Sequence, residues 1–143
     1  MNEYYFQTIH QIITTGHWIT DQVSDVLKPF GITEPQYNVL RTLHAAKGKP
    51  LTVQKLLDNM VQRSSNITRI VDKLIVKGYV ERKECPSNRR KMDITITTLG
   101  LEKLKVLDKK VFELHQPLMD NLNKEELIML KNLIIKLKTN HHD

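Results

Sequence analysis

Hydroxyl, amide and guanidinium side chains are concentrated in residues 63–69, which read Arg-Ser-Ser-Asn-Ile-Thr-Arg. Hydroxyl and amide groups hydrogen-bond to base edges in the major groove of DNA, and arginine pairs with guanine or with phosphate. The amino-terminal end of a helix here would also attract an anion through the helix dipole. We therefore expect the outward side of this helix to bind DNA through Arg63, Ser64, Ser65, Asn66, Thr68 and Arg69. The alternative is structural: the serines cap the helix and Arg69 is a solvated charge.

A second basic group, Arg89 and Arg90, follows the turn-forming residues Pro86-Ser87-Asn88. Short β-type runs at residues 79–83 and 92–97 flank it and predict a hairpin with a basic tip. Arginines on a narrow loop enter a minor groove, where an A·T-rich track concentrates negative potential. The alternative is an exposed charge pair that has no partner.

The chain of 143 residues carries a net charge of +6, and this charge is unevenly distributed. Residues 47–91 hold twelve Lys and Arg side chains and four acids, a net charge of +8. The remaining residues hold ten basic and twelve acidic side chains, a net charge of −2. A basic middle between near-neutral arms is the electrostatic pattern of a nucleic-acid-binding module. It is equally compatible with a solvated surface on which the lysines are unevenly spread.

Apolar residues that recur every three or four positions predict six helices. The helices lie at about residues 2–27, 33–46, 52–60, 63–77, 101–117 and 123–138. Thr33 and Gln36 are spaced as a capping box, and Asn123 begins a second capping signature. Thr52 is the expected N-cap of the third helix, and Gly78 is the expected left-handed stop of the fourth.

The order helix, helix, turn, helix, hairpin is typical of a winged helix-turn-helix. We therefore expect a mainly α fold with a small β-hairpin. Residues 31–98 form the expected DNA-binding domain, and residues 1–30 and 99–143 form an expected helical dimerisation region.

The terminal helices carry more apolar residues than a small winged domain can cover. Ile13 and Trp18 widen the apolar stripe of the first helix, and Ile128 and Ile135 lie off the main stripe of the last. Surplus apolar area on terminal helices indicates an interface, so we expect a homodimer. The alternative is a larger core within one chain. Gly16, on the first stripe, indicates either a kink or a close helix contact.

Four segments carry a more specific pattern. They read Leu51-Thr52-Val-Gln-Lys-Leu-Leu, Ser64-Ser65-Asn-Ile-Thr68-Arg69-Ile-Val-Asp72-Lys73-Leu74, Lys77-Gly78-Tyr-Val-Glu-Arg82 and Ile94-Thr-Ile96-Thr97-Thr-Leu-Gly100. Together they resemble the MarR family of bacterial transcription regulators, and the resemblance covers essentially the whole chain. The family's wing reads Arg, two residues, Asp, two residues, Asp-Arg-Arg, whereas Cys85 and Asn88 stand at the two Asp positions here. Asn88 can accept a hydrogen bond but carries no charge, so we expect a less firmly held Arg90 and a lower affinity for DNA.

The resemblance implies a homodimeric transcription regulator, a repressor, whose terminal helices interlock and whose subunits each offer one recognition helix and one wing to a pseudo-palindromic site. By position, Ser64, Ser65, Asn66, Thr68 and Arg69 would face the major groove, Thr52 and Lys73 the backbone, and Arg90 the minor groove. Family members also bind anionic aromatic effectors between the arms and the winged domain. His17, Tyr37 and Arg41 would line that pocket by position, and ordinary packing or exposure is the alternative.

Cys85 is the one cysteine of the chain, which excludes an internal disulfide framework and fits a reducing cytoplasm. The basic neighbours that we expect to lower the pKa of its thiol are Arg82, Lys83, Arg89 and Arg90. A redox switch at the wing is one interpretation, and an incidental thiol is the other.

No metal site, cofactor or enzyme activity is expected. His10 and His17 lie on one helix face with Asp21 one turn on, but zinc needs three or four convergent ligands. The sequence has no Gly-rich phosphate loop, nucleophile elbow or paired carboxylate in a cleft. No signal peptide and no apolar run of about 20 residues is visible, so we expect a cytoplasmic protein without membrane contact. The alternative function is that of a winged protein–protein adaptor.

Overall fold

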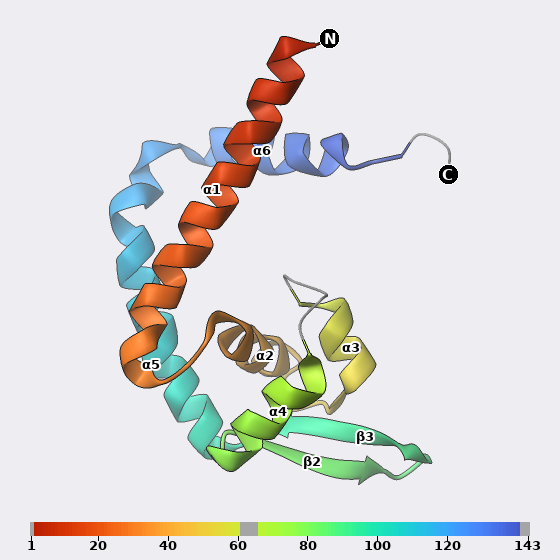
Figure 1. Ribbon diagram of the computed structural model, residues 1–143. Helices are drawn as coiled ribbons and strands as arrows, with labels where there is room; N and C mark the ends of the chain where they lie inside the picture. Colours follow the sequence, from red (N-terminus) through yellow and green to blue (C-terminus); the bar gives the residue numbers. More distant parts are fainter. Residues whose placement is uncertain (1, 61–65, 141–143) are drawn as a thin grey trace.

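The structure, a computed structural model, describes residues 2–60 and 66–140. Its elements, in chain order, are α1 (Glu3–Leu27), η1 (Lys28–Phe30), α2 (Glu34–Ala45), β1 (Leu51–Thr52), α3 (Val53–Asp58), α4 (Ile67–Val76), β2 (Val80–Cys85), β3 (Asn88–Ile96), α5 (Thr98–His115), η2 (Gln116–Asn121) and α6 (Lys124–Leu137). The helices α2, α3 and α4 gather with the sheet at one end of the molecule (Figure 1). The long α1 and the far part of α5 lead away from it, and α6 crosses beyond them (Figure 1).

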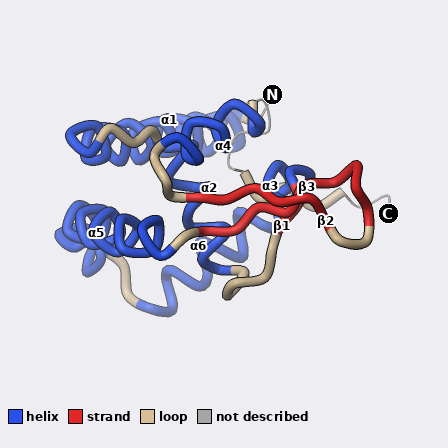
Figure 2. The backbone as a smooth tube through the Cα atoms, turned by 90° about the horizontal axis from the view of Figure 1, so that it is seen from below, coloured by secondary structure: helices blue, strands red, loops and turns tan. Residues whose placement is uncertain are grey.

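The sheet has three strands in the order β1-β3-β2, with both pairings antiparallel. The hairpin of β2 and β3 projects beyond the helices, so it forms a wing (Figure 2). The sequence predicted only the hairpin. It missed β1 because Leu51 and Thr52, which pair with Ile94 and Asp93, are too few to show an alternating pattern. The arrangement is a mainly α winged helix-turn-helix, as predicted.

Local hydrogen bonds explain where most of the helices begin. Thr33 and Gln36 form the predicted capping box of α2, and Asn123 forms the corresponding box of α6. Thr52 caps α3, accepting a hydrogen bond from the backbone N–H of Lys55. These predicted caps are confirmed. They were predictable because each depends on residues three apart in the chain.

The start of α4 differs from the prediction. Asn66 has extended backbone angles, and its side chain accepts a hydrogen bond from the backbone N–H of Arg69 at 3.2 Å. Asn66 is therefore the N-cap, and the helix begins at Ile67 rather than at Arg63. The predicted contact residues Arg63, Ser64 and Ser65 lie outside the described residues.

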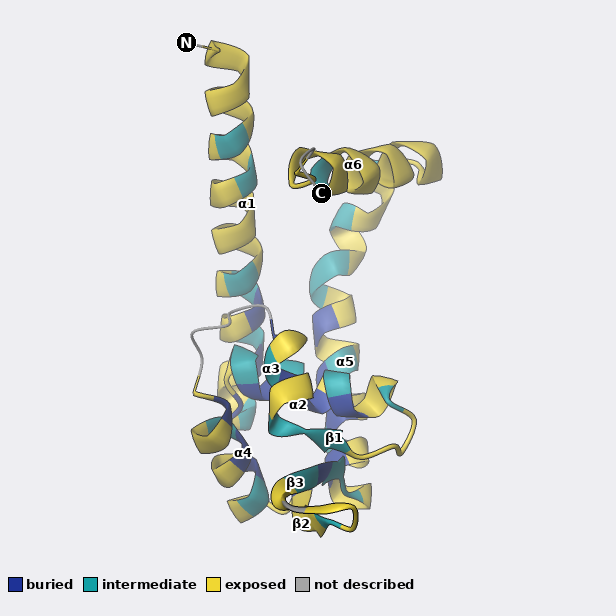
Figure 3. Cartoon of the chain, turned by 90° about the vertical axis from the view of Figure 1, so that its right-hand side faces the viewer, coloured by how far each residue is buried: buried dark blue, intermediate teal, exposed yellow. Residues whose placement is uncertain are grey.

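The core joins the winged helices to α5. Its fully buried side chains come from α1, α2, α3, α4, the sheet and α5, namely Leu27, Val39, Leu40, Leu43, Leu56, Val71, Leu74, Val80, Ile94, Leu104 and Leu107. Only the last turns of α1 take part, through Val23 and Leu27, and α6 has no buried residue. The core thus closes the winged region and leaves most of α1 and all of α6 outside it (Figure 3).

Hydrogen bonds and close backbone packing fix the wing against α5. The hydroxyl of Thr97 donates to the carbonyl oxygen of Gly78 at 2.6 Å and accepts from the backbone N–H of Gly100 at 3.0 Å. Gly78 has a φ of +79°, so it ends α4 in the left-handed conformation, as predicted. A Cβ on Gly100 would overlap the carbonyl oxygen of Tyr79, so only glycine fits there. The spacing of Thr97 and Gly100 is therefore a packing requirement.

Gly16 shows neither of its predicted features within this chain. The helix α1 runs through it without a break, and a Cβ built on Gly16 meets no atom within 4 Å. Within the described chain, this position is open.

Candidate nucleic-acid interface

The helix α4 separates an apolar side from a polar one. Ile67, Val71 and Leu74 are buried in the core. Thr68, Arg69 and Lys73 are exposed on the outward side, and all three were predicted to contact DNA. Because residues three and four apart share a helix face, burial of the apolar stripe fixes the direction of these polar side chains. The fold thus presents hydroxyl, guanidinium and ammonium groups on one surface.

Two other predicted contact residues have structural roles as well. The carboxamide oxygen of Asn66 caps α4, which leaves its amide N–H groups available to a base. The side chain of Thr52 caps α3, and its backbone pairs with β3. These contacts place both residues at the amino-terminal ends of the two helices of the helix-turn-helix.

An ion pair joins the wing to α4. Arg82 on β2 donates to Asp72 on α4 at 2.8 Å, and both side chains are partly exposed. Sequence reasoning did not single out this pair, because the two residues belong to different elements. An acidic residue on the otherwise basic outer side of α4 was the signal that could have indicated it. The pair ties the orientation of β2 to that of the helix.

The turn of the wing also differs from the prediction. The strand β3 begins at Asn88, so Arg89 and Arg90 lie in the strand rather than at a loop tip. The side chain of Asn88 accepts a hydrogen bond from the backbone N–H of Arg90 at 3.0 Å. Asn88 therefore holds the backbone of the turn by an uncharged hydrogen bond, while the Arg90 side chain is exposed.

Cys85 is the last residue of β2. Its sulfur lies 3.2 Å from the hydroxyl of Ser87. That hydrogen bond, followed by backbone hydrogen bonds from Ser87 and Asn88, lowers the pKa of the Cys85 thiol, and the charge of Asp93 opposes the shift. The direction agrees with the sequence prediction, but the cause is the hydrogen bonding of the turn, and the neighbouring Arg82, Lys83 and Arg90 do not contribute.

The three residues predicted to line an effector pocket do not converge. Tyr37 is buried, and its hydroxyl donates to Asp108 on α5 at 2.5 Å. Burial raises the pKa of Tyr37 to about 12, and the adjacent Asp108 contributes to the rise. The guanidinium of Arg41 lies 5.8 Å from the centre of the Tyr37 ring, but the exposed His17 lines a separate hollow between α1 and the start of α2. Tyr37 thus links α2 to α5 instead of facing an open pocket.

Residues 2–60 and 66–140 hold neither a metal-binding cluster nor a membrane-spanning helix. These residues contain no group of three or more His, Cys, Asp or Glu side chains placed to hold a metal ion. None of their helices combines the length and the apolar character needed to cross a bilayer.

Comparison with known proteins identifies relatives of this chain. A model of the MarR family matches residues 32–92. The multiple antibiotic resistance protein MarR of Escherichia coli K12 is 32% identical over 117 residues, which are 80% of this chain and 79% of that protein. The HTH-type transcriptional regulator PrsX of Escherichia coli is 35% identical over 81 residues, so the match spans 57% of this chain but only 49%, about half, of PrsX.

Solved structures of similar fold include MarR family proteins. A mutant of Escherichia coli MarR complexed with operator DNA is 28% identical, with a TM-score of 0.76, and the match covers 91% of this chain and 92% of that one. AbsC, a MarR family transcriptional regulator from Streptomyces coelicolor, shares the fold with a TM-score of 0.83 at 23% identity, over 96% and 93% of the two chains. Because the likeness to MarR extends over most of both sequences and includes the winged helix-turn-helix, the chain belongs to the MarR family.

Proposed function

We propose that the protein is a homodimeric transcription regulator that binds DNA, with α4 in the major groove and the wing at the adjoining minor groove. The observation that carries this proposal is the exposed polar and basic outer side of α4, whose opposite side is fixed in the core. The contact residues that we propose are Thr52, Arg63, Ser64, Ser65, Asn66, Thr68, Arg69, Lys73, Arg89 and Arg90. The DNA complex of the similar Escherichia coli MarR supports this function.

Exposed apolar side chains on the terminal helices support the homodimer. Those of α1 and α6 include Tyr4, Tyr5, Phe6, Ile13, Trp18, Leu127, Ile128, Met129, Leu130, Leu133, Ile135 and Leu137. An amphipathic helix whose apolar side has no partner within its own chain is stabilised by association. We therefore propose residues 1–30 and 99–143 as the dimerisation region and residues 31–98 as the DNA-binding domain.

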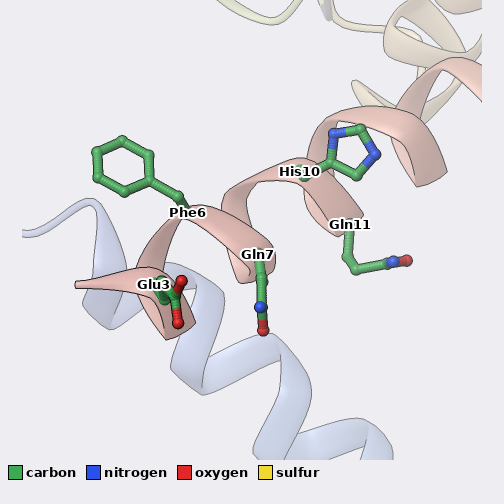
Figure 4. A pocket seen from close by; sticks show the side chains of 5 residues that line it. All are labelled: Glu3, Phe6, Gln7, His10 and Gln11. Atoms are coloured by element: carbon green, nitrogen blue, oxygen red, sulfur yellow. The ribbon is translucent and has the colours of Figure 1, made fainter. Parts of the chain in front are cut away.

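A hollow near the amino-terminal end of α1 fits the same proposal. It is lined by Glu3, Phe6, Gln7, His10 and Gln11, which all come from α1 (Figure 4). A hollow formed by one helix alone has an open side. The phenyl ring of Phe6 projects from this helix and is half-exposed in one chain (Figure 4). A second copy of the chain would cover it.

We propose further that the protein acts as a repressor by occupying promoter DNA, and that a small anionic or aromatic effector releases it. The transcriptional repressor MprA of Escherichia coli, 32% identical over 113 residues, supports a repressor. The hydrogen bond between Tyr37 and Asp108 connects α2 to α5. An effector that separates these helices would change the distance between the two α4 helices of a dimer and so weaken its fit to DNA.

Selection of bound duplexes from a random DNA pool, followed by binding measurements on the selected sequence, tests this function. Affinity should fall by about 10³ or more between 50 and 200 mM salt if roughly six phosphates are engaged. The Arg69→Ala variant should bind the selected duplex more weakly than the wild type does at the same salt concentration. The alternative function, a protein–protein adaptor, predicts no selected sequence and no steep salt dependence. That result would overturn the proposal.

A further inference from the structure

A groove of about 560 Å³ runs along α4 on the flank away from the wing. It lies between α4 and the amino-terminal end of α2, and its lining includes Gln36 from α2 and Asn66, Arg69, Ile70 and Lys73 from α4. The wing-side flank of α4 is held by the ion pair of Asp72 with Arg82. Because successive residues of a helix are about 100° apart, Asp72 and Lys73 point to opposite flanks of the exposed side.

The side chain of Gln36 is held rigidly at the wall of this groove. Gln36 is only 4% exposed, and its Oε1 accepts a hydrogen bond from the backbone N–H of Thr33 at 3.1 Å. No hydrogen bond of its Nε2 to another described residue is found. None of the described residues has a buried polar side-chain atom without a hydrogen-bond partner, so the unpaired Nε2 of Gln36 reaches the surface of the groove, where its N–H groups can donate to a ligand.

The groove also carries positive charge. Arg69 and Lys73 are exposed and lie one turn apart on α4, so two cations border the same groove. The amino-terminal end of α2 adds the positive end of its helix dipole. An amide donor, two cations and a helix amino terminus together favour an anion that accepts several hydrogen bonds, which is the chemistry of a phosphate group.

We propose that this groove seats a phosphate of the DNA backbone, with Gln36 as a hydrogen-bond donor beside Arg69 and Lys73. The inference rests on the proposed function and deepens it. Two phosphate strands border a major groove, and a helix lying in it presents one flank to each strand. The wing is tied to one flank of α4, so the groove at α2 receives the strand on the other side. Gln36 thereby becomes a contact residue that the motif on α4 does not include.

Gln36→Glu is the variant that tests this contact. A carboxylate oxygen can still accept from Thr33, because Glu is a common partner in a capping box, so the start of α2 is kept. The other carboxylate oxygen replaces the amide donor with a negative charge that repels phosphate. We expect at least about 10-fold weaker binding of the selected duplex and of a mixed-sequence duplex alike, because a backbone contact carries no sequence information. A carboxylate at this mostly buried position lowers the melting temperature, so binding is compared at a temperature at which the variant is fully folded.

Gln116→Glu is the matched control, since Gln116 is exposed at the start of η2, away from α4. It should bind both duplexes like the wild type. Binding of Gln36→Glu within twofold of the wild type, in a preparation whose Arg69→Ala variant is weakened, would overturn the groove contact and leave the proposed function intact. Failure of the wild type to bind any duplex would instead overturn the proposed function.

Lys73→Gln supplies a second test that does not depend on the cap of α2. The variant should bind DNA more weakly and show a smaller salt slope, by about one per chain. If Gln36 and Lys73 contact the same phosphate, the loss in the double variant should be smaller than the product of the two single losses. A loss equal to that product would place the two residues on separate groups and contradict the proposal.

Inorganic phosphate at matched ionic strength separates the two sources of a phosphate group. We expect titration of the wild-type protein with inorganic phosphate to show no saturable binding, because one free ion does not bring the neighbouring contacts of a duplex. Saturable binding that Gln36→Glu abolishes would overturn the assignment to DNA and identify a site for the free ion.

Discussion

The winged region and the helical arms contain similar apolar side chains but place them differently. In the winged region, Leu40, Leu56, Leu74 and Ile94 are fully buried around one core. On the arms, Trp18 is 46% exposed, and most apolar side chains of α6 have a similar exposed fraction (Figure 3). The helices of the winged region are stabilised by packing within their own chain, whereas α6 has no buried residue. The difference indicates that the winged region shares a core with the end of α1 and with α5. It supports the proposal that a second copy covers the rest of the arms.

Leu133→Asp should have the largest effect, because it places a charge in the proposed interface. Leu133 is 56% exposed in one chain, and a partner would bury it. An unpaired buried charge costs several kcal/mol, so the dimer dissociation constant should rise by about 1,000-fold. Sedimentation at micromolar concentration should show a dimer for the wild type and a monomer for the variant.

Asn132→Asp is the control for this change, since it adds a charge to the same helix at a polar position. It should remain dimeric. Equal masses for the wild type and Leu133→Asp would show that the apolar side of α6 does not form a dimer interface. This result would contradict the proposed difference between the arms and the winged region.

A pair of glycine substitutions compares the two regions directly. Gly100→Ala should lower the free energy of unfolding by about 3 kcal/mol, because its Cβ would overlap the carbonyl oxygen of Tyr79. Gly16→Ala should raise it by about 0.5–1 kcal/mol, because the position is open and alanine favours a helix. Urea unfolding at fixed protein concentration measures both. A destabilising Gly16→Ala would show that a partner helix packs closely against α1 at this point.

The hydrogen bond between Tyr37 and Asp108 predicts a loss of stability at high pH. The pKa of Tyr37 is about 12 in the folded chain and about 10 in the unfolded chain, so folding retains a proton that unfolding releases. The protonated hydroxyl of Tyr37 should stabilise the fold fully below pH 10. The free energy of unfolding should then fall by about 2 kcal/mol as the pH rises through 12.

Comparison of the wild type with Tyr37→Phe by urea unfolding at several pH values isolates this term. The variant should be less stable at neutral pH, where it lacks the hydrogen bond, and should lose less stability between pH 10 and 12. Parallel losses in the two proteins would show that Tyr37 is not the group responsible.

The ion pair of Asp72 with Arg82 should give the smallest effect. Both side chains are partly exposed, so a double-mutant cycle with Asp72→Asn and Arg82→Gln should give a coupling of about 0.2–1 kcal/mol. The pair of Lys83 with Glu81 is the control, since its atoms are 4.0 Å apart and its side chains are more exposed. Its coupling should be near zero. Equal coupling in the two cycles would mean that the wing is not held to α4 by this contact.

Local features of the fold were predictable from the sequence. The caps at Thr33, Thr52 and Asn123 and the stop at Gly78 depend on residues within a few positions of each other, so short patterns contain them. The apolar stripes gave the buried sides of α2 and α4 for the same reason. The family motifs indicated the outer side of α4, and Thr68, Arg69 and Lys73 are exposed there.

Features that depend on tertiary contacts were not predictable. The two residues of β1 become a strand only because β3 lies beside them. The pair of Asp72 with Arg82 and the approach of Gly100 to Tyr79 join different elements, and no short pattern encodes them. The three supposed effector residues do not form one pocket, because His17 lines a separate hollow and the hydroxyl of Tyr37 is bonded to Asp108 of α5. Sequence position alone does not reveal such a partner.

The mass of the protein–DNA complex tests the central claim most directly. Sedimentation of the protein with one duplex chosen by selection from a random pool gives the number of chains bound. Two chains on each duplex, related by a pseudo-palindromic sequence with half-sites about one helical turn apart, is the result that the arms and the two α4 helices predict. A complex of one chain with one duplex, or no complex at low salt, would contradict the account.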